Sequence, residues 1–242
     1  MGGPHVHVAR RLLEGALDGP TGDELVRAAR TVIAELGTPE RLLPLVRELA
    51  QGLGDPSGCA LLSYRHILGF DKLLLVDGGP RHMLRAHIWH PGAHTREDVH
   101  NHRSPLASYV VRGALGMELY EAAGPEAGGG VVAPWYRESL SGDEGDWLLE
   151  PAGRARLRLT QTAEYTAGSG YALPPHVLHR AWCASRGPTV TLFLETGSGR
   201  RRYTDVFTSA SAAQADASAV AKKPLGVEDY LAELNALAEL IS

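Results

Sequence analysis

The sequence predicts a mainly β protein, built as a small antiparallel barrel or sandwich with helices before and after it. From Cys59 to Phe207 the apolar residues recur with a period of two, in short runs. Glycine and proline turn signals separate these runs. No helical pattern of useful length lies between them, which argues against a parallel sheet with crossover helices. One main β domain with helical appendages is therefore expected.

The clearest strand pattern covers Arg154–Thr160. Leu157 and Leu159 fall on one face of this run, and Arg156 and Arg158 fall on the other. Seven further runs of similar length are expected to form strands: Lys72–Asp77, His82–His90, Ala107–Arg112, Gly116–Glu121, Val131–Glu138, Leu178–Ala184 and Thr189–Glu195.

The first 55 residues have helical periodicity instead. The segment from Thr21 to Glu24 is a capping box, in which the two side chains would bind free amides at a helix start. Apolar residues then repeat at helical spacing as far as Leu36. Pro39 is tolerated at the first position of a helix, whereas Pro44 should kink that helix or delay its start. With a shorter helix over 7–17, residues 1–55 are expected to cap the barrel at 56–207; a partner-binding module is the alternative.

Residues 208–242 divide into a linker and a helix. The stretch after Phe207 is small, polar and low in complexity, as in linkers. The run Val227–Ile241 then places Leu231, Leu234 and Leu237 on one stripe of a helix. We expect this helix to dock on the barrel or on a partner subunit.

Composition excludes several classes of function. The net charge is −4 with both signs interspersed, which gives no footprint for nucleic acid. The longest apolar runs, such as Leu73–Val76, are far shorter than the ~20 residues of a membrane helix. The N-terminus has no continuous apolar stretch of the kind found in secretory signals. Cys59 and Cys183 cannot form a disulfide framework, so we expect a cytoplasmic protein without membrane contact.

Histidine is the one unusual count: there are 11, and six of them fall within residues 82–102. Side chains two apart on a strand point the same way, so His100 and His102 would present two imidazoles to one point. His179 lies 77 residues after His102, behind a Pro-Pro turn that can lead into a neighbouring strand. Neutral imidazoles bind iron, zinc, copper or nickel, although two histidines at this spacing can also be plain surface residues.

These two segments resemble the two signature motifs of the cupin superfamily. The matching residues are His100, His102 and Gly113 in the first motif, and Gly168, Pro174 and His179 in the second. The first motif usually has a glutamate as well, but that position falls here at Leu106 or Ala107. His176 stands where the second motif prefers glycine. The missing carboxylate implies a site of three histidines, which is the pattern of the thiol dioxygenases, including cysteine dioxygenase.

The resemblance covers roughly residues 60–195 and implies a double-stranded β-helix. It implies a metal at His100, His102 and His179, with Fe(II) first and zinc, nickel, manganese or copper as alternatives. It also implies an oxygenase that takes O2 and a small chelating, amino-acid-like substrate, and it allows a homodimer. The Ser–His–Tyr relay of the thiol dioxygenases would fall near Thr191, Phe193 and Glu195, and none of these matches it. Their carboxylate-binding arginine falls near Lys72.

Three facial imidazoles leave three positions open on an octahedral metal. That is enough for a two-point chelating substrate and for dioxygen. Neutral ligands also leave the metal its full positive charge, which favours an anionic chelator. Zinc in a tetrahedral site of three histidines and a water would support hydrolysis or hydration instead.

The strand before the first motif carries the main substrate candidates. Met83, Arg85, His87 and Trp89 share one face, which points either into the barrel mouth or to the outer side under a loop or helix. In the first case Arg85 would hold a substrate carboxylate through a bidentate pair. The expected catalytic residues are Arg85, Tyr109 and Glu195. The expected substrate-binding residues are Lys72, Arg85, His87, Trp89 and Arg103, while His94 and His176 are alternative metal ligands.

Two other functions remain open at this stage, because one fold supports many chemistries. The first is a metal-dependent isomerase, lyase or hydrolase, which would work without consuming oxygen. The second is a non-catalytic protein that binds a small molecule in the barrel mouth.

Overall fold

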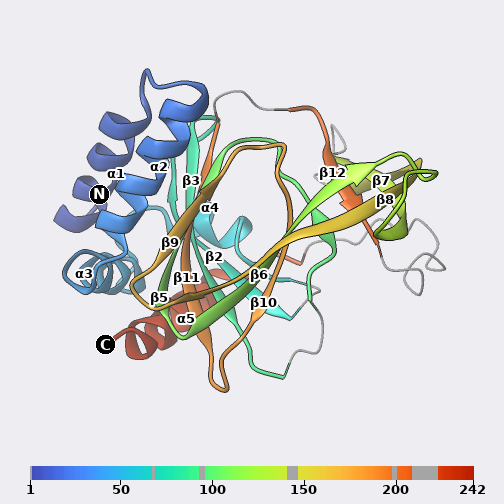
Figure 1. Ribbon diagram of the computed structural model, residues 1–242. Coiled ribbons are helices and arrows are strands. Elements are labelled where there is room, and N and C mark those ends of the chain that lie inside the picture. Colours follow the sequence, from blue (N-terminus) through green and yellow to red (C-terminus); the bar gives the residue numbers. More distant parts are fainter. Residues whose placement is uncertain (1, 67–68, 93–95, 141–146, 198–200, 209–222) are drawn as a thin grey trace.

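The computed structural model describes residues 2–66, 69–92, 96–140, 147–197, 201–208 and 223–242. Strands predominate, and helices lie near both ends of the chain. Figure 1 shows helices α1, α2 and α3 on one side of the molecule, with strands β7, β8 and β12 on the opposite side. The helices are α1 Pro4–Leu17, α2 Gly22–Leu36, α3 Pro39–Ala50, α4 Pro56–Leu61 and α5 Val227–Leu240.

The first sheet has six antiparallel strands in the order β1-β2-β3-β11-β5-β9. The chain therefore enters at one edge and returns twice from distant positions to fill the middle of the sheet. Its strands are β1 Tyr64–Arg65, β2 Phe70–Asp77, β3 His82–Trp89, β5 Leu106–Arg112, β9 Gly170–Leu173 and β11 Thr189–Thr196.

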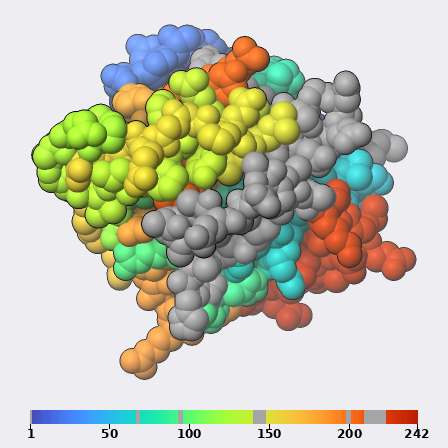
Figure 2. All heavy atoms as spheres, turned by 90° about the vertical axis from the view of Figure 1, so that its right-hand side faces the viewer, coloured from blue at the N-terminus to red at the C-terminus, as the bar shows by residue number. Residues whose placement is uncertain are grey.

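The second set of strands pairs in a closed cycle, β10-β4-β12-β7-β8-β6 and back to β10. We call this set the strand ring. Its strands are β4 Val99–His100, β6 Ala114–Ala123, β7 Val131–Leu140, β8 Trp147–Thr166, β10 Leu178–Cys183 and β12 Thr204–Phe207. In the space-filling view β7 and β8 run side by side across one face of the molecule (Figure 2). The pairing of β12 with β7 closes the cycle.

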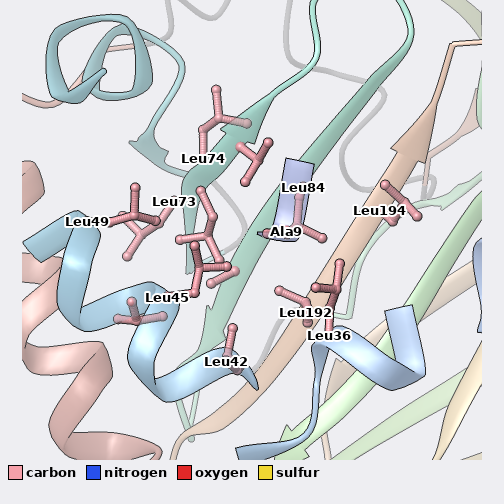
Figure 3. Close-up of a cluster of buried hydrophobic side chains, with 14 of the residues drawn as sticks. Ala9, Leu36, Leu42, Leu45, Leu49, Leu73, Leu74, Leu84, Leu192 and Leu194 are labelled. Atoms are coloured by element: carbon pink, nitrogen blue, oxygen red, sulfur yellow. The ribbon is translucent and has the colours of Figure 1, made fainter. Parts of the chain in front are cut away.

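One face of the six-stranded sheet is covered by helices. Leu73, Leu84 and Leu192 are fully buried there against side chains of α1, α2 and α3 (Figure 3). From α5, Tyr230 is buried in the same core, and its hydroxyl donates to the backbone oxygen of Leu74 at 2.6 Å. All four residues of the apolar run Leu73–Val76 belong to this core, and a register shift between Leu74 and Val76 interrupts the alternation of β2 there.

The other face of this sheet meets the strand ring across a second core. We call this space the gap. Its buried residues come from both strand sets, for example Trp89 and Phe193 from the sheet, and Met117 and Ala181 from the ring. A third, smaller cluster around Val99, Ala133, Leu157, Leu178 and Phe207 is built from ring strands alone.

The expected strands are present, and most of their ends differ by a few residues, but β8 extends seven residues before and six residues after the expected Arg154–Thr160. The structure adds four short strands, β1, β4, β9 and β12, and the short helix α4, which alternation did not predict. These elements have two to six residues, so periodicity has too few positions to act on. The predicted linker lies mostly outside the described residues.

The helix predictions need two corrections. Thr21 is the N-cap of α2, but its side chain makes no capping hydrogen bond, so the predicted capping box is wrong. The first turn still carries Asp23 and Glu24, which favour a helix start through the helix dipole. Helix α3 begins at Pro39 and continues through Pro44, so its start is not delayed. Among the described residues, no helix is long and apolar enough to span a membrane.

Candidate metal centre

Three histidines from two distant parts of the chain meet at the gap. Each of His100, His102 and His179 offers one ring nitrogen, and these nitrogens lie within 4.8 Å of one another. The ring centroids are 5.0 Å apart for His100 and His102, 4.7 Å for His100 and His179, and 5.1 Å for His102 and His179. His100 and His179 face each other directly across the antiparallel pair β4–β10. The described residues contain no other histidine, cysteine or carboxylate group of this kind.

The position of His102 differs from the sequence-based expectation. Strand β4 ends at His100, so His102 is not held by the pleat of a strand. Backbone hydrogen bonds hold the segment instead: Asn101 N–H donates to the Asp205 oxygen at 3.1 Å, and His102 N–H donates to the Pro175 oxygen at 3.3 Å. The irregular segment brings the second imidazole to the others, although the reasoning from strand alternation does not apply to it.

Backbone carbonyls set the orientation of two imidazoles. The Nδ1 atom of His100 lies 2.8 Å from the Asp98 oxygen, and Nδ1 of His179 lies 3.2 Å from the Val177 oxygen. A carbonyl can only accept, so each Nδ1 carries the hydrogen and each Nε2 keeps its lone pair. This arrangement, with one ring nitrogen anchored and the other free, is typical of metal-ligating histidines.

Burial keeps the imidazoles of His102 and His179 neutral. Burial, followed by the neighbouring His100, lowers the pKa of His179 to about 3. Burial likewise holds the pKa of His102 well below its ordinary value, with contributions from His100 and His179. Neutral imidazole is the form that binds a metal. The donor set therefore fits a divalent transition metal with three nitrogen ligands and open positions.

The face of the six-stranded sheet that lines the gap carries an ordered array of side chains. Cross-strand pairing places Lys72 beside His87 and His87 beside Thr191; in the next row it places Arg85 beside Phe193. The His87 ring stacks on Phe193 at 4.7 Å, and the His102 ring lies 5.9 Å from Phe193 on the other side of the gap. The Phe193 ring therefore lies between His102 and His87, and we call it the floor of the gap.

The polar members of the array differ in what they bind. Arg85 is engaged, because its Nη1 lies 3.3 Å from Oε2 of Glu195 and both side chains are largely buried. Lys72 makes cation–π contacts with Phe70 and Tyr64, and it has no ion pair within the part of the chain that the structure describes. Its charge contributes to lowering the pKa values of His87 and His102.

His87 and Trp89 complete the array. Burial, ahead of Lys72 and Arg85, holds the pKa of His87 well below its ordinary value, and its Nε2 atom has no hydrogen-bond partner. The indole nitrogen of Trp89 donates to Thr191 at 3.2 Å, and the indole stacks on Phe70 at 4.1 Å.

Other expected site residues lie elsewhere. Tyr109 is on the opposite face of β5, where its ring lies against Gly37 of the helical layer, because its neighbours Ser108 and Val110 take the gap face. The backbone oxygen of Arg103 accepts a hydrogen bond from Arg201. His176 is exposed and does not join the three histidines. His94 lies outside the described residues.

Sequence reasoning missed Phe193 and Phe70, the two aromatic rings between which the array is organised. The signal for Phe193 was present, since Thr191, Phe193 and Glu195 alternate with three aliphatic residues along β11. Phe70 lies two residues before the predicted start of its strand, so no alternation pointed to it.

No family model matches this sequence, and no curated protein matches it. Among solved structures, it is similar to an RmlC-like cupin from Shewanella frigidimarina, with 18% identity over 56% of this chain and 83% of that chain, at a TM-score of 0.34. A cupin-like protein from Thermotoga maritima gives 14% identity over 58% and 77%, with a TM-score of 0.34. A polyketide cyclase from Streptomyces resistomycificus gives 18% identity over 58% and 73%, with a TM-score of 0.35.

Proposed function

We propose that this protein is a cupin-type oxygenase with one metal, Fe(II), held by His100, His102 and His179. The substrate is a small chelating molecule of amino-acid type, and the chemistry resembles that of the thiol dioxygenases. The observation that carries the proposal is the convergence of three imidazoles with no carboxylate among them. When bound, the metal supplies open positions at which a chelating substrate and dioxygen meet.

The chain's own residues have separate tasks in this proposal. The carbonyls of Asp98 and Val177 fix the tautomers of His100 and His179, so their Nε2 atoms stay available. The stacked rings of Phe70, Trp89, His87 and Phe193 form an apolar wall that excludes water. Lys72 supplies a positive charge beside this wall, which suits an acidic group on the substrate.

The Arg85–Glu195 pair takes a different role from the one expected from sequence. Because the Arg85 guanidinium already contacts a largely buried carboxylate, we assign it to positioning the floor of the gap rather than to binding a substrate carboxylate. Lys72 is the better anchor, since the described residues offer it aromatic rings but no carboxylate.

Metal content is the first experiment. The wild-type protein, purified without oxygen, is compared by elemental analysis with the double variant His100→Ala/His179→Ala. The single variant His176→Ala is the matched control, because this exposed histidine lies three residues before His179 and does not join the group. We expect about one iron per chain in the wild type and in the control, and none in the double variant. Oxygen uptake is then measured with small thiols and amino acids.

The other outcomes separate the rival functions. Zinc or nickel at the same stoichiometry, also lost in the double variant, would replace the oxygenase with a metal-dependent isomerase, lyase or hydrolase. Protein without metal, or metal unaffected by the double substitution, would overturn the metal site and favour a non-catalytic binding protein.

A further inference from the structure

A second cavity lies at the strand ring, apart from the three histidines. Its volume is about 510 Å³, which is within the usual size range of small-molecule sites. All six ring strands, or residues directly at their ends, contribute to it. The lining residues are Asn101, Ala122, Ala123, Gly124, Pro125, Trp135, Arg154, Ala155, His176, Leu178, Arg201, Asp205 and Phe207.

The pair β4–β10 separates this cavity from the metal centre like a shared wall. Along β10, Leu178 lines the cavity whereas the next residue, His179, belongs to the histidine group. Just beyond the end of β4, Asn101 lines the cavity, whereas the residues on either side of it, His100 and His102, belong to the histidine group. None of the three histidines lines the cavity, so the two sites are distinct.

The inner surface of the cavity is apolar and partly aromatic. Ala155, Leu178 and Phe207 are buried in the small ring core, and Trp135 packs against that core. The rings of Trp135 and Phe207 lie nearly parallel, at 11°, with centroids 6.2 Å apart. Two parallel rings and small alanine side chains leave a flat apolar space, which suits a planar ligand.

The single carboxylate of the lining is already satisfied. Asp205 accepts hydrogen bonds from Trp135 Nε1 at 3.0 Å, from Asn101 Nδ2 at 2.8 Å and from Arg201 Nη2 at 3.0 Å. Arg154 adds a second positive charge, and it has no ion pair within the described part of the chain. Two guanidinium groups against one carboxylate give the lining a net positive charge, which calls for an anionic partner.

We propose that this cavity is a second ligand site, which binds a small planar aromatic anion. The aromatic body of the ligand lies against Trp135 and Phe207, and its carboxylate or sulfonate binds Arg154 at the rim. The proposal does not depend on the metal or on the reaction at the three histidines.

The test uses 8-anilinonaphthalene-1-sulfonate, a fluorescent planar anion, titrated into the full-length folded protein. We expect one saturable site per chain. Arg154→Gln should weaken binding about tenfold, because it removes a charge-assisted hydrogen bond. Ala155→Trp should abolish binding by filling the cavity. The matched control is Arg158→Gln, on the same strand, because this exposed arginine pairs with Glu121 and does not line the cavity.

The double variant His100→Ala/His179→Ala identifies whether the probe occupies the cavity or the metal centre. Unchanged affinity in this variant supports the second site, whereas loss of binding would place the probe at the metal centre and overturn the proposal. Equal affinity in the wild type, Arg154→Gln and Ala155→Trp would overturn it too, as would the absence of saturable binding. Circular dichroism spectra and melting midpoints verify that each variant is folded, since the probe also binds partly unfolded chains.

Discussion

The two faces of the six-stranded sheet are buried in different ways. Toward the helices, the sheet presents mostly aliphatic side chains, such as Leu73, Leu84 and Leu192, which are less than 1% exposed. Toward the gap, the same strands present Lys72 and His87 among aromatic rings. One face is therefore a plain hydrophobic core, and the other combines burial with polar groups that can bind a ligand.

This difference assigns stability mainly to the helix-covered face and ligand binding to the gap face. Buried aliphatic contacts stabilise a fold without further conditions, whereas a buried polar atom lacking a partner costs free energy. Nε of Arg85 and Nε2 of His87 are two such atoms, and both belong to the gap side. Such a cost in free energy is expected at a binding site, and the helix-covered core offsets it.

The largest expected effect is a cavity on the helix-covered face. Leu192→Ala should lower the free energy of unfolding by about 3–5 kcal/mol, because Leu192 is fully enclosed. Leu119→Ala, at the partly exposed margin of the gap core, should cost only about 1–2 kcal/mol. Urea unfolding monitored by circular dichroism measures both. Equal losses would show that the two faces contribute alike.

Metal binding should stabilise the gap side alone. At a free Fe(II) concentration 100 times Kd, the holoprotein should gain about 2.7 kcal/mol over chelator-treated protein. His179→Ala should abolish this gain, whereas Leu192→Ala should retain it despite its lower stability. Thermal melts under anaerobic conditions measure the difference. A metal-dependent gain that survives in His179→Ala would place the ion elsewhere.

Acid should destabilise the metal-free protein because the buried histidines at the gap resist protonation. Burial lowers the folded-state pKa of His179 to about 3 and holds that of His87 well below the ordinary value of about 6.5. Below pH 6.5 the unfolded chain therefore binds protons that the folded protein does not, and the free energy of unfolding falls as the pH drops toward 3.

Urea unfolding of chelator-treated protein between pH 7 and pH 4 measures this slope. His87→Leu should flatten it by about one proton per molecule within that window. A slope that is unchanged in this variant would mean that His87 does not stay neutral in the fold.

The smallest effect concerns the free energy that it costs to bury the neutral imidazole of His87. At pH 7.5, His87→Leu should leave the free energy of unfolding unchanged or raise it by up to about 1 kcal/mol, because it removes a buried nitrogen that lacks a partner. Urea unfolding at that pH measures the change. A loss above about 2 kcal/mol would show that the imidazole is a structural member of the core, and the contrast between the faces would then be weaker.

Much of this architecture follows from local sequence patterns. The strands from 72 to 77 and from 189 to 195 are long enough for alternation or a continuous apolar run to mark them. The three histidines were also predictable, because their spacing matches a known pair of motifs. Strand alternation was expected to bring His100 and His102 together. His102 instead lies beyond the end of β4, which is Val99–His100.

The rest depends on contacts between distant residues. Strand β12 has four residues, and its pairing with β7 joins Thr204 to Glu138 across 66 positions. The second cavity exists only because this pairing closes the ring, and Asp205 meets Asn101 through the neighbouring pairing of β12 with β4. No local pattern encodes such a closure, so neither the cavity nor its lining could be predicted.

The shared wall has a consequence for how this chain can change. Between Val99 and His102, successive side chains belong to two different sites. His100 and His102 belong to the histidine group, whereas Val99 and Asn101 face the ring core and its cavity. Inserting or deleting a single residue there would move the histidines away from one another and Asn101 away from Asp205. Descendants of this sequence can therefore vary the residue types facing the ring more freely than the length of this segment.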